Sequence, residues 1–416
     1  MYIIEKSNEV SGEVLLNGSK NAVLPIMAAA CLCEDEVTLY NVPLELNDVK
    51  IMLEILQEVG FNIEPIGNDT LKYYPQRNKT INNTVSEKGS RIRYSLLLLS
   101  LLMHKCGKAK ITKPGGCNFG DRKYDIHLDS LTKMGAAINE DQQYIYGSSE
   151  AGLKGRTLLF HTATTSGTEN VIIAGIKADG TTIIQNAHTC PEVLDLVRFL
   201  NHMGASIRYK ARYIEIEGNH KLGGGEYTIM NDKDEAVTYM ILAAINRGRI
   251  IIKNFDHRIL QSEVHLLRQI GVSVEQQGSD ICIDARGRSL EPFHLATAPY
   301  PGIVDAQPLF AALAMTIEGE SIITEMRHMS RFQYVDEFRK LGADIDHYYN
   351  CIIIHGGKAL HGAEVNAPDL RAGAALLLAG SVSEGKTIIR NEEQIERGYS
   401  SIVKKMSALG CNIKSL

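Results

Sequence analysis

The chain has 416 residues, of which 44% are hydrophobic and 22% are charged, and its formal net charge is -5. A chain of this length is too long to form a single ordinary hydrophobic core, so we expect two domains. The negative net charge argues against a general nucleic-acid-binding protein. The eight cysteines are scattered without a CxxC pair, which argues against a zinc site of the usual spacing.

The N-terminal segment lacks the basic and then apolar pattern of a secretory signal. The longest dense apolar run, residues 94–103, is shorter than the roughly 20 residues that a membrane-spanning helix needs. We therefore expect a cytoplasmic protein whose partners are neither membranes nor nucleic acids. Nothing in the sequence predicts its oligomeric state.

One pattern recurs six times along the chain: a helix that is apolar on every side, a short turn and a β-rich strand. A helix that is apolar all round is buried all round, so each repeat contributes one interior helix. These helices are predicted at residues 25–33, 94–104, 171–178, 237–246, 309–316 and 372–382. The strands that follow them begin near residues 37, 110, 181, 250, 321 and 387.

An amphipathic helix completes each repeat and ends at a glycine, a residue that suits the left-handed C′ position. These glycines lie about 70 residues apart and are Gly60, Gly135, Gly204, Gly271, Gly342 and Gly410. Six near-equal repeats predict an α/β protein with two domains of three repeats, each an inside-out α/β barrel with helices inside and sheets outside. We expect residues 1–19 plus 229–416 to form one domain and residues 20–228 the other.

Polar and charged residues gather where the buried helices begin. The six groups are Ser19-Lys20-Asn21, Arg91 with Arg93, Thr164 to Thr168, Asp232 to Glu235, Asp305, and Asp369-Leu370-Arg371. A helix N-terminus favours anions, and arginine grips carboxylates and phosphates with two hydrogen bonds. If the repeats stack alike, these helix starts and Arg122, Arg331 and Arg397 would face one cleft that binds a small, multiply negative substrate.

Several motifs give the chain a family resemblance. They are GlySerLys20Asn21, ProGlyGlyCys117AsnPheGlyAspArg122, AspIleHis127, ThrAlaProTyrPro301Gly, AlaProAsp369LeuArg371 and GluArg397GlyTyr. From Val10 to the C-terminus the chain resembles the UDP-N-acetylglucosamine enolpyruvyltransferases, the 1-carboxyvinyltransferases of peptidoglycan synthesis. The resemblance implies the enolpyruvyl transferase fold, which agrees with the repeat count.

The resemblance also implies a reaction, in which phosphoenolpyruvate gives its enolpyruvyl group to a sugar hydroxyl and phosphate leaves. It implies that Lys20, Arg122 and Arg397 hold the phosphate, while Arg331 and Arg371 hold the carboxylate. Asp305 would accept the hydroxyl proton, and Lys20 would also touch the acceptor. The other residues that it places at the substrates are Asn21, Arg93, Asp125, Ile126, Thr164, Ser166, Arg327 and Asp369.

Cys117 has three implied roles: it protonates the methylene carbon, forms a covalent adduct or assists product release. A cysteine among arginines has a lowered pKa and is a usable nucleophile. The antibiotic fosfomycin would alkylate it. No metal or organic cofactor is implied.

Departures from the family pattern lie on the acceptor side, at Lys123, Thr162, Arg327 and Met329. Three hypotheses therefore stay open. The acceptor is UDP-N-acetylglucosamine, or it is a different nucleotide or sugar in a specialised pathway, or the chain is a non-catalytic binding homologue. The complete set of motif residues argues against the last.

Overall fold

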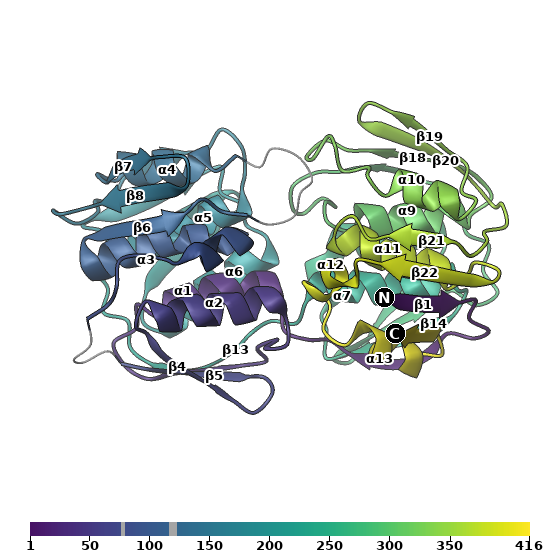
Figure 1. Ribbon diagram of the computed structural model, residues 1–416, viewed down its shortest axis with the longest axis horizontal. Helices are drawn as coiled ribbons and strands as arrows, with labels where there is room; N and C mark the ends of the chain where they lie inside the picture. The colour runs from purple at the N-terminus through teal and green to yellow at the C-terminus, as the bar shows by residue number, and fades with distance from the viewer. Residues whose placement is uncertain (76–79, 116–122) are drawn as a thin grey trace. The chain divides into compact units, whose positions relative to one another are not determined.

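The computed structural model describes residues 1–75, 80–115 and 123–416. Contacts divide the chain into two compact units. Unit 1 contains residues 1–17 and 232–416, and unit 2 contains the described residues between 18 and 231. Each unit is described by itself below (Figure 1).

Unit 2 has three buried helices, each followed by strands and an amphipathic helix. The buried helices are α1 (Lys20–Ala30), α3 (Leu97–Cys106) and α5 (Thr165–Ile176), and the amphipathic ones are α2 (Asn47–Glu58), α4 (Asp125–Lys133) and α6 (Pro191–His202). Two 3₁₀ turns, η1 (Glu87–Arg91) and η2 (Arg93–Leu96), lead into α3. Figure 1 shows the buried helices inside the unit and the sheets around them.

The strands of unit 2 form three small sheets. The first has the order β13 (Gly225–Thr228), β3 (Val37–Tyr40), β5 (Thr70–Tyr74), β4 (Asn62–Ile66). The second has the order β6 (Lys108–Thr112), β8 (Tyr144–Ser148), β7 (Ala137–Glu140). The third has the order β11 (Ser206–Lys210), β12 (Tyr213–Glu217), β10 (Thr181–Gln185), β9 (Thr157–Leu159).

Unit 1 repeats the same plan. Its buried helices are α7 (Lys233–Ile245), α9 (Gln307–Met315) and α11 (Leu370–Gly380). Its outer helices are α8 (Gln261–Ile270), α10 (Val335–Lys340) and α13 (Ile402–Ala408), with two short additional turns, η3 (His257–Leu260) and α12 (Glu392–Glu396).

Three four-stranded sheets surround these helices. The first has the order β15 (Ser273–Gln277), β16 (Asp280–Asp284), β14 (Arg249–Lys253), β2 (Ser11–Leu15). The second has the order β17 (His294–Ala296), β18 (Gly319–Thr324), β20 (Cys351–Gly356), β19 (Ile345–Tyr348). The third has the order β21 (Glu364–Asn366), β22 (Lys386–Arg390), β1 (Tyr2–Glu5), β23 (Asn412–Ser415). In all three, one outer pair is parallel and the other two are antiparallel. The first strand of the chain thus completes the last sheet, so both termini belong to unit 1 (Figure 1).

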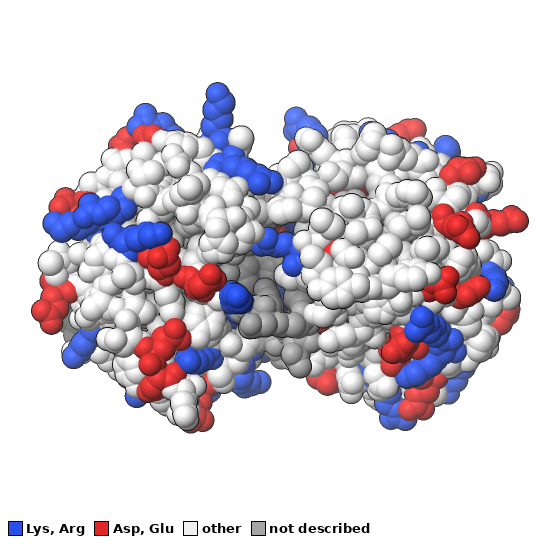
Figure 2. Space-filling view, turned by 90° about the horizontal axis from the view of Figure 1, so that it is seen from above, with Lys and Arg blue, Asp and Glu red and all other residues white. Residues whose placement is uncertain are grey.

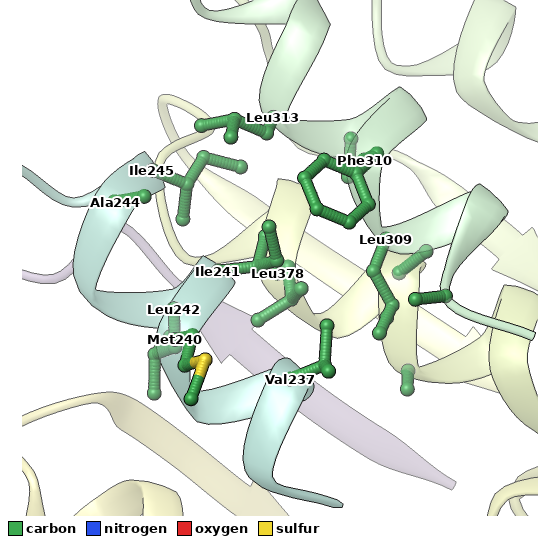
Figure 3. Packing of buried hydrophobic residues seen from close by; sticks show 14 of the residues in the cluster. Val237, Met240, Ile241, Leu242, Ala244, Ile245, Leu309, Phe310, Leu313 and Leu378 are labelled. Carbon is green, nitrogen blue, oxygen red and sulfur yellow. The ribbon is translucent and has the colours of Figure 1, made fainter. Parts of the chain in front are cut away.

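The core of unit 1 lies where its three buried helices meet. Val237 and Ile241 of α7 pack near Leu309 and Phe310 of α9 and Leu378 of α11, and all five are fully buried (Figure 3). Each such side chain contributes about 1.5–3 kcal/mol by leaving water. The six predicted repeats and their interior helices are therefore confirmed.

Most of the buried helices begin before their predicted starts. Three of them start at Lys20, Thr165 and Lys233, a turn or more upstream of the expected residues. The reason is that a polar first turn interrupts the apolar pattern but still forms helix. At α3 the error is reversed: the helix begins at Leu97, because the residues just before it form the 3₁₀ turn η2.

The predicted glycine ends are confirmed. All six glycines have a positive φ, between 90° and 111°. Gly271 is a clear case: it caps α8 in the left-handed conformation, and a Cβ there would lie 2.8 Å from the carbonyl oxygen of Ser289. An L side chain at this position would be strained by its backbone and crowded by its neighbour.

Acidic and basic side chains are interspersed on the face that Figure 2 shows, and neither sign covers a whole unit. This pattern agrees with the small net charge. Within the described part of the chain, no helix has both the length and the apolar composition needed to cross a membrane.

Candidate active site

Ion pairs lie at the starts of the three buried helices of unit 1. Arg331 donates from Nη1 to Oδ1 of Asp305, which lies just before α9, at 2.9 Å. Arg371, in the first turn of α11, donates from Nη2 to Oδ2 of Asp234 in the first turn of α7. Both arginine side chains are buried, with exposures of 3% and 4%, so each needs a carboxylate close by.

Asp305 differs from its partner because its side chain is 43% exposed. Burial among its neighbours would raise its pKa, but the charges of Arg331, Arg371 and Lys233 outweigh burial and hold the pKa well below its usual range. Asp305 is therefore a carboxylate that stays ionised and that a small molecule can reach. These are the properties of a group that accepts a hydrogen bond from a ligand and stabilises nearby positive charge.

Asp369 caps the helix that carries Arg371. Its Oδ1 accepts hydrogen bonds from the backbone N–H groups of Arg371 and Ala372, at 2.8 and 3.1 Å. This is an ordinary N-cap, and it fixes the position of the Arg371 backbone. Arg397 lies at the C-terminal end of α12 and is half-buried.

A buried glutamate holds the segment that contains Arg327. Oε1 of Glu325 accepts hydrogen bonds from the backbone N–H groups of Arg327 and His328, at 2.7 and 2.8 Å, and from the Thr297 hydroxyl at 2.6 Å. Glu325 is completely buried. The backbone of Arg327 is therefore fixed four residues before Arg331, while Met329 is exposed.

In unit 2, Lys20 opens α1 and its Nζ lies 3.1 Å from Oδ2 of Asp48 in the first turn of α2. Both side chains are only 9% exposed. The backbone carbonyl of Asn21 accepts a hydrogen bond from the Tyr94 hydroxyl at 3.3 Å, which links the starts of two repeats. Arg93 lies in η2 and donates to the backbone carbonyl of Lys123 at 2.6 Å.

The other predicted residues of unit 2 lie at the starts of α4 and α5. Asp125 and Ile126 are the first residues of α4, and Thr164 is the N-cap of α5. Nε2 of His127 lies 3.1 Å from the hydroxyl of Ser166, which joins the two helices. Burial, helped by the charge of Arg93, lowers the pKa of His127 to about 3, so its ring is neutral at ordinary pH.

The structure thus gathers Asp305, Arg331 and Arg371 in unit 1, and Lys20, Asn21 and Arg93 around the helix starts of unit 2. Cys117 and Arg122 lie outside the described residues. Sequence reasoning did not assign Asp234, Asp48, Glu325 or His127 to the site. Asp234 and His127 belong to motifs that the sequence analysis names. Their partners, Arg371 and Ser166, are 137 and 39 residues away, and a local sequence pattern does not indicate such distant contacts.

Within the described ranges, no group of three or more His, Cys, Asp or Glu side chains is arranged to hold a metal ion. The chemistry that the described residues offer is electrostatic and acid–base. Unit 1 supplies an ionised carboxylate and two buried guanidinium groups, and unit 2 supplies a buried ammonium group at a helix N-terminus.

Comparison with known proteins gives a consistent result. Residues 4–406 match the family described as EPSP synthase (3-phosphoshikimate 1-carboxyvinyltransferase). Proteins named UDP-N-acetylglucosamine 1-carboxyvinyltransferase from Idiomarina loihiensis and Cellvibrio japonicus are 37% and 38% identical to this chain. The alignments cover 99% and 100% of this chain and 98% and 99% of those relatives.

Two solved structures share the architecture. The enolpyruvyl transferase NikO from Streptomyces tendae gives a TM-score of 0.89 at 24% identity, over 99% of this chain and 98% of that one. An EPSP synthase from Acinetobacter baumannii gives 0.81 at 20% identity, over 100% of this chain and 99% of that one. At these identities the similarity shows a common fold.

Proposed function

Because the chain belongs to the 1-carboxyvinyltransferase (enolpyruvyl transferase) family, with full-length relatives named for UDP-N-acetylglucosamine, we propose that it transfers the enolpyruvyl group of phosphoenolpyruvate to a hydroxyl of that nucleotide sugar. Phosphate is the second product. The reaction is the first committed step of peptidoglycan synthesis. Both substrates are cytoplasmic metabolites, so we expect the enzyme to act there.

The observation that carries this proposal is the ionised, reachable carboxylate of Asp305 beside two buried arginines. Enolpyruvyl transfer joins the acceptor oxygen to C2 of phosphoenolpyruvate while a proton is added at C3. The acceptor hydroxyl must lose its proton as it attacks, and Asp305 accepts it. The positive charge that develops at C2 is stabilised by the same carboxylate.

The substrate anions need fixed cations. Arg331 and Arg371 in unit 1 bind the carboxylate of phosphoenolpyruvate. As the family resemblance implies, Lys20, Arg122 and Arg397 bind its phosphate. Cys117 supplies the proton at C3 in the addition step. In the elimination step a C3 proton is lost, and its electron pair forms the C2–C3 double bond as the C2–O bond to phosphate breaks and phosphate leaves.

The test is phosphate release from phosphoenolpyruvate with a panel of acceptors. We expect release with UDP-N-acetylglucosamine and none with shikimate 3-phosphate or with no acceptor. Asp305→Asn serves as a matched control that should abolish the acceptor-dependent signal. Release with another nucleotide alone would reject this acceptor and would point to the departures at Lys123, Thr162 and Arg327. No release with any acceptor would reject the transferase.

A further inference from the structure

Arg371 is held by unit 1 on two sides. Its Nη2 is bonded to Oδ2 of Asp234, and the guanidinium carbon lies 5.1 Å from the centre of the Tyr399 ring. The Tyr399 hydroxyl is in turn 2.7 Å from the hydroxyl of Thr238, on α7. A planar guanidinium that is stacked on a ring and paired at one end has little freedom to rotate.

One arm of the same guanidinium is left open. Nη1 of Arg371 is buried and has no hydrogen-bond partner among the described residues. A buried N–H group of a charged side chain is unfavourable without an acceptor. An arm kept open in this way suits an anionic ligand, and the proposed substrate carries a carboxylate.

Three carboxylates act on Arg371, and Asp234 is the one that interacts with it most strongly. The charges of Asp234, Asp232 and Asp305 all raise the pKa of Arg371, with Asp234 the strongest of the three, against burial, which lowers it. Asp232 is occupied as the N-cap of α7, where Oδ1 accepts two backbone hydrogen bonds. If Asp234 is removed, Asp305 is therefore the one of these three carboxylates that does not cap a helix and still acts on Arg371.

Lys233 fixes Asp234 from the other side. Its Nζ lies 2.9 Å from Oδ1 of Asp234, while Oδ2 serves Arg371. Both oxygens of the aspartate are thus used by cations. Asp234 is buried, with a side-chain exposure of 6%, so it is not itself a group that substrate reaches easily.

We propose that Asp234 is a positioning residue, which holds Arg371 away from Asp305 and keeps its free arm directed at the carboxylate of phosphoenolpyruvate. This inference rests on the proposed function, because it names the group that Arg371 binds. A purely structural ion pair would affect stability alone. A purely electrostatic effect has the opposite sign, since removing a negative charge near Arg371 would strengthen the binding of an anion.

The test uses Asp234→Asn, which keeps the shape and removes the charge, and Asp234→Glu, which restores the charge. For Asp234→Asn we expect kcat/KM for phosphoenolpyruvate to fall at least tenfold, while KM for the acceptor changes less than about threefold. Asp234→Glu should recover most of the loss. The matched control is Asp284→Asn, which weakens the surface pairs of Asp284 with Arg286 and Arg249 in the same unit and should leave both constants unchanged.

A second variant covers the possibility that Asp234→Asn does not fold. Tyr399→Leu removes the stacking surface and leaves the ion pair, and it should also raise KM for phosphoenolpyruvate selectively. Unchanged or tighter use of phosphoenolpyruvate by folded Asp234→Asn would overturn the proposal. So would equal losses for both substrates, which would indicate general damage to the site.

Equilibrium dialysis with labelled phosphoenolpyruvate alone separates this inference from the proposed function. If wild type binds phosphoenolpyruvate but releases no phosphate with UDP-N-acetylglucosamine, the acceptor assignment fails, and weaker binding by Asp234→Asn still supports the role of Asp234. If wild type turns over and binds phosphoenolpyruvate no better than Asp234→Asn, the role of Asp234 fails and the function stands.

Discussion

At the scale of single residues, Asp305 and Arg331 have opposite environments although they are paired. The arginine is 3% exposed and is locked by its surroundings, whereas the aspartate is 43% exposed. A buried cation beside a reachable anion lets the protein keep the anion ionised without covering it. This asymmetry leaves Asp305 open to the acceptor substrate, while Arg331 orients Asp305 in addition to its proposed contact with the carboxylate of phosphoenolpyruvate.

The first prediction concerns Asp305→Asn. The amide still accepts a hydrogen bond from Arg331 but cannot take a proton, so kcat should fall by about 10²–10⁴-fold. Binding of phosphoenolpyruvate should persist, because the side-chain cations are retained. Steady-state kinetics and dialysis measure the two quantities. A kcat within fivefold of wild type would exclude Asp305 as the base.

At the scale of elements, the polar first turns of two buried helices, α7 and α11, combine capping with binding groups. In α11, Asp369 caps the helix while the next-but-one residue, Arg371, enters the candidate site. In α7, Asp232 is the cap and Asp234 pairs with that arginine. The same turn therefore begins a helix and positions a charged side chain, so the candidate site lies at the helix starts.

The second prediction separates the two uses of Asp369. Asn caps helices as well as Asp does, so Asp369→Asn should keep the free energy of unfolding, whereas Asp369→Ala should lose about 1 kcal/mol. Denaturant titration measures both. If Asp369 also acts in the candidate site, Asp369→Asn loses activity while it remains stable. Full activity in Asp369→Asn would limit the residue to its capping role.

The third prediction concerns a tie between two buried helices. His104 of α3 donates from Nε2 to the carbonyl oxygen of Ala174 in α5, at 2.9 Å. Burial lowers the pKa of His104 to about 4, from an ordinary value of 6.5. The folded state therefore binds fewer protons than the unfolded state between these pH values, and stability is lost as pH falls from about 6.5 towards 4.

His104→Gln keeps a donor and removes this titration. Between pH 6.5 and 4, its unfolding free energy should fall less steeply than that of wild type, by at most about 1.4 kcal/mol per pH unit. Thermal unfolding across this range measures the difference. His355 is the control of opposite sign, because its hydrogen bond with Asp346 raises its pKa. Parallel pH profiles for wild type and His104→Gln would contradict the assignment.

At the scale of the whole molecule, the chain forms two compact units. The stretch from residue 18 to residue 231 is continuous, and its ends lie together, since Ser19 donates to the carbonyl of Met230 and Gly18 bridges Asn231. Unit 1 instead needs the N-terminal strands β1 and β2 to complete two of its sheets. We propose that the continuous stretch is an independent domain.

The fourth prediction tests this division. A chain of residues 18–231 alone should fold with a cooperative thermal transition, because its sheets and interior helices are complete. It should release no phosphate, because Asp305, Arg331 and Arg371 are in the other unit. Circular dichroism and the phosphate assay give the two results. Turnover by residues 18–231 alone would show that unit 1 is dispensable for catalysis.

By itself, the sequence determined the architecture and the family. Apolar periodicity, six glycines about 70 residues apart and the motif residues are local signals that can be read without knowledge of the fold. The same signals misplaced the helix starts, since hydropathy does not register a polar first turn such as the one at Thr165.

Only the tertiary structure decided which charges meet. The pairs Arg371–Asp234, Lys20–Asp48 and Arg331–Asp305 join residues 137, 28 and 26 positions apart. A buried charge requires a partner, but its sequence pattern does not say which of several nearby carboxylates will provide it. That choice depends on how the helix starts pack around the core. It determines that Asp305 stays ionised and that Nη1 of Arg371 has no hydrogen-bond partner among the described residues.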